Sequence, residues 1–96
     1  SRFPSSDIDL AFVVDESTPA EELRRTLLTA SDEVQPVLVE LFDVFRSEQL
    51  GEGRKSLALR LRFQEPDRTL TDAEVAEARA AIIAAAESVH GATLRG

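Results

Sequence analysis

The chain has 96 residues, of which 43% are hydrophobic and 30% are charged, so its composition is that of one soluble globular domain with a modest core. Its formal net charge of -7 argues against a general nucleic-acid binder, because affinity for phosphates comes mainly from Lys and Arg. The absence of cysteine excludes disulfides and thiolate metal sites, and the longest apolar runs, 10–14 and 80–86, are too short to span a bilayer.

The N-terminal part of the chain predicts a strand followed by a helix. Residues 8–14 alternate in side-chain size, which is typical of a strand. Thr18 is the predicted N-cap of the helix, with Pro19 at the first helical position and Glu21 completing a capping box. The apolar stripe of this helix consists of Leu23, Leu27 and Ala30.

The middle of the chain predicts a hairpin with a long connection. One strand is expected from about Val37 to Arg46 and its partner from about Lys55 to Gln64. The segment 51–53, Gly-Glu-Gly, lies in the connection. Residues 46–68 contain 6 basic and 4 acidic side chains, whereas 1–45 contain 3 and 10. If the protein contacts RNA, we expect the contact in this net-positive segment.

A second helix is predicted after Leu70. Thr71 and Glu74 form a capping box, and Leu70 and Val75 occupy the hydrophobic-staple positions. Gly91 is the expected C-terminal stop, and residues 92–95 form a short closing strand. The apolar positions of this helix are Val75, Ala78, Ile82, Ala86 and Val89.

The order β-α-β-β-α-β predicts an α+β fold of the ferredoxin-like type, with an antiparallel-type sheet and both helices on one face. The first and third strands would lie in the middle of the sheet, with alternate side chains directed to the core and to an open face. The predicted core positions are Leu10, Phe12, Val14, Leu57, Leu59, Leu61 and Phe63. The predicted open-face positions are Asp9, Ala11, Val13, Ser56, Ala58, Arg60, Arg62 and Gln64.

Small side chains on the open face, flanked by two arginines, would let a flat ligand or a phosphate backbone approach closely. The pattern alone leaves simpler interpretations open. Arg60 and Arg62 would be ordinary solvated arginines, and Phe45, near the end of an edge strand, would be a core residue. Arg54 and Lys55 would only protect a sheet edge. The sequence contains no nucleotide loop, metal cluster or nucleophile–base pair, so we predict no catalytic residue and no metal site.

Six blocks of the sequence, in order and with the right spacing, carry a resemblance to a known family. They are Phe3–Pro4, Asp9–Asp15, Glu40–Arg46, Gly53–Leu61, Asp67–Asp72 and Gly91–Arg95. Over essentially its whole length, the chain resembles the ferredoxin-fold anticodon-binding domain that closes the beta subunit of bacterial phenylalanyl-tRNA synthetase.

The resemblance implies that residues 1–96 are one domain, a fragment of a larger beta subunit in a cytoplasmic alpha2 beta2 enzyme. That parent enzyme uses ATP and magnesium to join phenylalanine to its tRNA. This domain alone would be no enzyme, would hold no cofactor, and would bind the anticodon arm of phenylalanine-specific tRNA. An aromatic residue at the place of Phe45 stacks on an anticodon base in the family, and Ala11 and Ser56 fall where sheet residues approach the RNA.

The expected RNA-binding residues combine the open face with the basic segment. Two departures from the family pattern, Phe45 in place of a common Tyr and Ile8 in place of a common basic residue, predict weaker binding by the isolated domain. The expected contacts are Ala11, Phe45, Arg46, Arg54, Lys55, Ser56, Ala58, Arg60 and Arg62.

Two rival functional classes remain on the same fold. An acylphosphatase-like enzyme needs a phosphate-binding loop with an Arg after the first strand, and the acidic sequence of residues 15–19 does not suit it. The alternative is a regulatory module that dimerises through its sheet and binds a small ligand.

Overall fold

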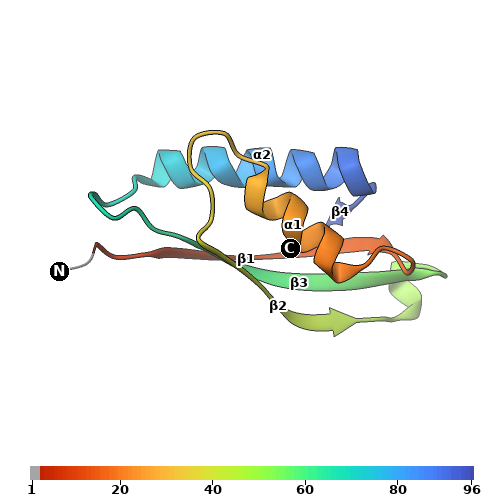
Figure 1. The fold of residues 1–96 in the computed structure, drawn as a ribbon. Coiled ribbons are helices and arrows are strands. Elements are labelled where there is room, and N and C mark those ends of the chain that lie inside the picture. Colours follow the sequence, from red (N-terminus) through yellow and green to blue (C-terminus); the bar gives the residue numbers. More distant parts are fainter. Residues whose placement is uncertain (1–2) are drawn as a thin grey trace.

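The computed structural model describes residues 3–96 and contains the predicted elements in the predicted order (Figure 1). Within the described residues, no helix is both long and apolar enough to cross a bilayer. The strands and helices are β1 (Ser6–Asp15), α1 (Ala20–Thr29), β2 (Leu38–Phe45), the 3-10 turn η1 (Glu48–Leu50), β3 (Arg54–Phe63), α2 (Asp72–His90) and β4 (Thr93–Leu94).

The strands form one antiparallel sheet in the order β2-β3-β1-β4. This confirms the ferredoxin-like arrangement, with the first and third strands at the centre. β1 and β3 pair along their whole length, from Ser6 opposite Phe63 to Asp15 opposite Arg54. Both helices lie on one side of the sheet, which leaves the other side without a helical layer (Figure 1). We call this second side the open face.

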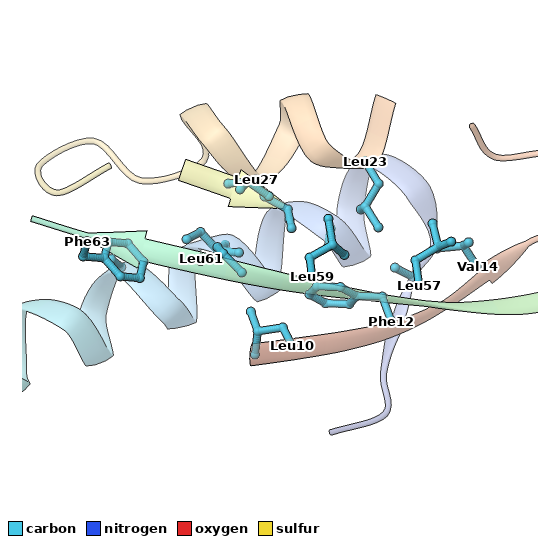
Figure 2. Packing of buried hydrophobic residues seen from close by; sticks show 14 of the residues in the cluster. Leu10, Phe12, Val14, Leu23, Leu27, Leu57, Leu59, Leu61 and Phe63 are labelled. Carbon is cyan, nitrogen blue, oxygen red and sulfur yellow. The ribbon is translucent and has the colours of Figure 1, made fainter. Parts of the chain in front are cut away.

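The core lies between the sheet and the two helices, and the predicted alternation of β1 and β3 is confirmed (Figure 2). Burying each large apolar side chain contributes about 1.5–3 kcal/mol, so this layer supplies most of the stabilisation of the fold. The buried strand residues are Leu10, Phe12, Val14, Val39, Leu57, Leu59, Leu61 and Phe63. The helices contribute Leu23, Leu27, Ala78, Ile82 and Ala86.

The predicted cap of α1 is wrong. The N-cap residue is Pro19, not Thr18, and no side chain caps the helix. The Pro19 carbonyl accepts hydrogen bonds from the backbone of Glu22 and Leu23, which leaves Thr18 in the preceding turn. The Glu21 carboxylate does not reach back to a cap, because it accepts hydrogen bonds at 2.8 Å from the Arg24 guanidinium.

The predicted boundaries of α2 are confirmed. The Thr71 hydroxyl accepts from the Glu74 backbone at 3.1 Å, and the Glu74 carboxylate accepts from the Thr71 backbone at 2.9 Å, so the capping box is complete. Gly91 ends the helix with a φ of 62°, in the left-handed region that glycine adopts without strain.

The predicted burial of Val89 is wrong, since its side chain is 64% exposed. The buried stripe of α2 advances from Ala78 to Ile82 and Ala86 in steps of four residues, each of which turns the stripe by about 40°. One more such step reaches His90, whose Nε2 lies 2.7 Å from the Thr26 hydroxyl of α1. His90 therefore faces α1, and Val89 points to solvent.

Candidate nucleic-acid interface

A β-bulge in β2 decides which side chains of this strand reach the open face. Leu41 lies opposite Leu59 and Asp43 lies opposite Ala58, so Phe42 is an extra residue in β2. Val39, before the bulge, is buried in the core. In a regular strand Phe45, six residues later, would face the core as well.

After the bulge, the alternation of β2 is shifted by one residue. Phe45 pairs with Ser56, an open-face position of β3, and its side chain is 40% exposed. Directly opposed residues of an antiparallel pair point to the same side of the sheet. Phe45 therefore lies on the open face, and the interpretation of Phe45 as a core residue is wrong.

Phe45 meets an arginine that comes from the opposite edge of the sheet. The chain beyond β4 continues its pairing with β1, because the Arg95 backbone N–H donates to the Ala11 carbonyl at 2.7 Å. The Arg95 guanidinium reaches back over the sheet and lies 4.7 Å from the centre of the Phe45 ring. Arg95 Nη1 also donates to the Ser56 hydroxyl at 3.4 Å. Side chains from the two edges of the sheet, Phe45 and Arg95, thus meet above the central strands β1 and β3.

This contact covers part of the small-residue floor, which consists of Ala11, Ser56 and Ala58. Ala11 and Ala58 pair with each other in the middle of the sheet and are half-buried. Ser56 points to the open face as predicted, but it is only 2% exposed because it lies beside Phe45 and Arg95. A ligand on the open face meets Phe45 and Arg95 before it meets Ser56.

A second aromatic–arginine pair lies on the same face. Phe42, at the bulge, is 48% exposed, and the Arg60 guanidinium lies 5.0 Å from the centre of its ring. Arg60 also donates two hydrogen bonds to the Asp9 carboxylate, at 2.9 and 3.1 Å. The contact with Asp9 raises the pKa of Arg60 and compensates its charge.

Arg62 is held in the same way by the neighbouring carboxylate of β1. Its guanidinium donates to Asp7 at 3.0 Å through two nitrogens, and this hydrogen bonding lowers the pKa of Asp7. Both predicted arginines of the open face are therefore charge-compensated by aspartates that lie opposite them in the β1–β3 register. They form a neutral, exposed border to the small-residue floor.

The remaining predicted cations gather at the end of the sheet where the β2–β3 connection meets the β1–α1 loop. Arg46 donates to the Glu16 carboxylate at 2.8 Å, which lowers the pKa of Glu16, and Lys55 Nζ lies 3.7 Å from the same carboxylate. Arg54 donates to the Val13 carbonyl at 3.4 Å. One acidic side chain thus compensates part of the charge of this basic group.

The structure brings Ala11, Phe45, Ser56, Ala58 and Arg60 onto one face and keeps Arg62 at its border. Arg46, Arg54 and Lys55 lie at the end of the sheet instead. Phe42 and Arg95 also lie on the open face, and neither was predicted from the sequence. The aromatic side chain of Phe42, within a predicted strand of the sheet, was only a weak indication of a role on the open face. No local sequence pattern indicated such a role for Arg95.

A hollow of about 250 Å³ elsewhere in the molecule has the wrong charge for RNA. It lies in the helical layer, between the segment after α1 and the first half of α2, and acidic side chains dominate its lining. These are Asp32, Glu33, Glu74 and Glu77. The open face is therefore the better candidate for a nucleic-acid interface.

Comparison with known proteins identifies relatives of the chain. The chain is 52% identical over 96 residues to the phenylalanine–tRNA ligase beta subunit of Corynebacterium efficiens, covering 100% of this chain and 11% of the relative. It is 48% identical over 97 residues to that of Cutibacterium acnes, covering 99% of this chain and 11% of the relative. It is 45% identical over 97 residues to that of Geobacillus kaustophilus, covering 99% of this chain and 12% of the relative.

The chain spans about a tenth of the length of these curated relatives. The sequence profile of the family described as ferredoxin-fold anticodon binding domain matches residues 1–95. This match covers nearly the whole chain and agrees with the β-α-β-β-α-β order and the single four-stranded sheet of the described residues. The chain belongs to the ferredoxin-fold anticodon-binding domain family.

Proposed function

We propose that this chain is the anticodon-binding part of the beta subunit of a phenylalanine–tRNA ligase and that its open face contacts the anticodon arm of phenylalanine-specific tRNA. The family supports this function, as do the names of relatives that match over the full length of this chain. The structural observation that carries it is the exposed ring of Phe45 on the side of the sheet that no helix covers. Single-stranded bases of RNA loops are commonly recognised by stacking on such aromatic side chains.

In this proposal Phe45 stacks on an unpaired anticodon base. Ala11 and Ala58 keep the sheet surface beneath it low, so that the RNA approaches the strands closely. Arg46 and Arg54, at the adjacent end of the sheet, would meet phosphates of the same loop, whereas Lys55 is only 11% exposed and lies against Glu16. Arg60 and Arg62 would lie at the edge of the contact and would shape the surface more than they attract phosphates, because Asp9 and Asp7 compensate their charges.

The parent enzyme, in the same proposal, is cytoplasmic and pairs this beta subunit with an alpha subunit in an alpha2 beta2 assembly. It would use ATP and magnesium to join phenylalanine to the tRNA. Residues 1–96 form one domain of that beta subunit and hold the RNA at a distance from the reaction. Because the chain has a net charge of -7, we expect binding by the domain alone to be about micromolar or weaker at physiological salt.

Two RNA hairpins of equal length test the proposal, one with the anticodon stem-loop of phenylalanine-specific tRNA and one with its acceptor stem. Titration of the 96-residue chain should show tighter binding of the anticodon hairpin. Extending the stem so that the three anticodon bases are paired should remove the difference, because stacking on Phe45 needs an unpaired base. Equal binding of both hairpins would contradict an anticodon-arm function.

The alternative regulatory module makes a different forecast in the same experiment. A domain that dimerises through its sheet would cover Phe42 and Phe45 with a second copy. Sedimentation of the chain alone should then show a dimer, and the anticodon hairpin should not bind or should compete with dimerisation.

A further inference from the structure

Arg95 differs from the other arginines of the open face in its charge balance. Arg60 and Arg62 each form two hydrogen bonds with an aspartate. Within residues 3–96, Arg95 forms no ion pair with any carboxylate. It is also exposed to solvent. Its charge is therefore available to a ligand that lies on the open face.

The neighbours of Arg95 fix its direction and occupy only one of its donors. The Phe45 ring lies against the guanidinium at 4.7 Å, and the Ser56 hydroxyl accepts one hydrogen bond at 3.4 Å. A guanidinium carries five N–H donors in a planar fork, so most of them remain free. Ser56, at 2% exposure, is too deeply covered to be a major contact itself.

We infer that Arg95 binds a phosphate of the RNA, and that Phe45 and Ser56 position its guanidinium for this contact. This inference rests on the proposed function and adds a residue to the same site. A planar guanidinium matches two phosphate oxygens better than an ammonium does. The contact also places the phosphate beside the Phe45 ring, where a base stacked on that ring would bring it. Ser56 then contributes to RNA binding only by positioning Arg95.

The test measures how the binding of the anticodon hairpin depends on salt. Each phosphate neutralised by a protein cation contributes about 0.7–0.9 to the slope of log K against log salt concentration. Arg95→Gln should reduce this slope by about that amount and weaken binding on the order of tenfold, the effect of losing one charge-assisted contact. Arg95→Lys should keep the slope, because it keeps the charge, while binding remains weaker than in the parent.

Arg79 provides a matched control. It is an exposed arginine of α2, in the helical layer, and it forms no ion pair within the described residues. Arg79→Gln changes the net charge by the same amount as Arg95→Gln. It should leave the salt slope unchanged, because Arg79 lies on the other side of the sheet from the proposed RNA contact.

A double-mutant cycle separates positioning by Ser56 from a direct contact. Ser56→Ala should weaken binding in the parent, because Arg95 loses its hydrogen bond, and should have no further effect in Arg95→Gln. An equal effect of Ser56→Ala in both backgrounds would show that Ser56 does not act through Arg95. Thermal melts of all variants give the folded fraction, and titrations run below the lowest melting transition keep the comparison valid.

The results of these titrations test the role of Arg95 separately from the proposed function on which it rests. If the parent binds the anticodon hairpin but Arg95→Gln keeps its salt slope, or changes it no more than Arg79→Gln does, Arg95 does not bind a phosphate. The proposed function would then stand without it. If the parent binds neither hairpin, both the function and the role of Arg95 are wrong.

Discussion

Truncation of Phe45 separates a binding residue from a core residue. Phe45→Ala should weaken binding of the anticodon hairpin by about 1–3 kcal/mol, the usual contribution of a base stacked on an aromatic ring. Phe45 lies at the edge strand β2 and is 40% exposed, so its contribution to stability should be limited.

The cost in stability can be estimated from buried area. A fully buried Phe removes roughly 200 Å² from water, and at about 25 cal/mol per Å² the covered part of Phe45 gives an upper limit near 3 kcal/mol. The Cβ atom remains in Ala, and the flexible Arg95 side chain can settle onto the vacated surface, so no closed cavity forms. We therefore expect the free energy of unfolding to fall by about 1–2 kcal/mol.

Two controls calibrate this value. Phe12 is fully buried, and Phe12→Ala should cost about 3–5 kcal/mol, as other large-to-small core substitutions do. Val89 is exposed on α2, and Val89→Ala should change stability by no more than about 0.5 kcal/mol and leave binding unchanged. Urea denaturation and hairpin titrations on the same samples give both quantities. If Phe45→Ala unfolds as easily as Phe12→Ala, and unfolding explains its loss of binding, the stacking argument fails.

Three further predictions concern the same site and the ends of α2. Phe45→Tyr should bind the anticodon hairpin as well as the parent or better in titrations, because it keeps the ring and restores the hydroxyl common in the family; weaker binding would contradict this. Hydrogen bonds from Arg68 and Thr71 lower the pKa of Glu74 from 4.5 to about 2. The stabilisation that the ionised Glu74 carboxylate gives to the folded state is therefore complete above pH 4.5 and disappears as the pH falls toward 2. The melting temperature of the parent should accordingly exceed that of Glu74→Gln at pH 7 and approach it near pH 2, whereas a constant difference would exclude this linkage. Gly91→Ala should lower the free energy of unfolding by about 1–2 kcal/mol in urea, because Ala is strained at a φ of 62°, and should leave RNA binding intact.

The sequence predicted the parts of the fold that depend on local patterns. The four alternating apolar residues of β3 identified both faces of the central strands, because the period of a strand is two residues. The capping box at Thr71 was predictable because both of its side chains lie within one turn. Thr18 shows where such a pattern fails, since Pro19 capped the helix with its backbone alone.

The side of the sheet on which Phe45 lies could not be read from residue patterns. The bulge at Phe42 has no sequence signature of its own, and it reverses the alternation of every later residue in β2. Only the family resemblance indicated an exposed ring. Arg95 was missed for a different reason, because its contacts with Phe45 and Ser56 cross the full width of the sheet and join residues far apart in the chain.

In the proposed function, the charge arrangement would let an acidic domain present an RNA-binding face without binding nucleic acid generally. Asp7 and Asp9 compensate the arginines beside them, so most of the open face attracts phosphates weakly. Stacking on Phe45 requires an unpaired base, which an anticodon loop offers and a duplex does not. The domain would then distinguish an anticodon loop from duplex RNA by the shape of the RNA more than by its charge. If the chain belongs to a synthetase as proposed, the affinity missing from a single weak contact would come from the rest of that enzyme, because one tRNA held at two places gains the effective concentration of a bivalent ligand.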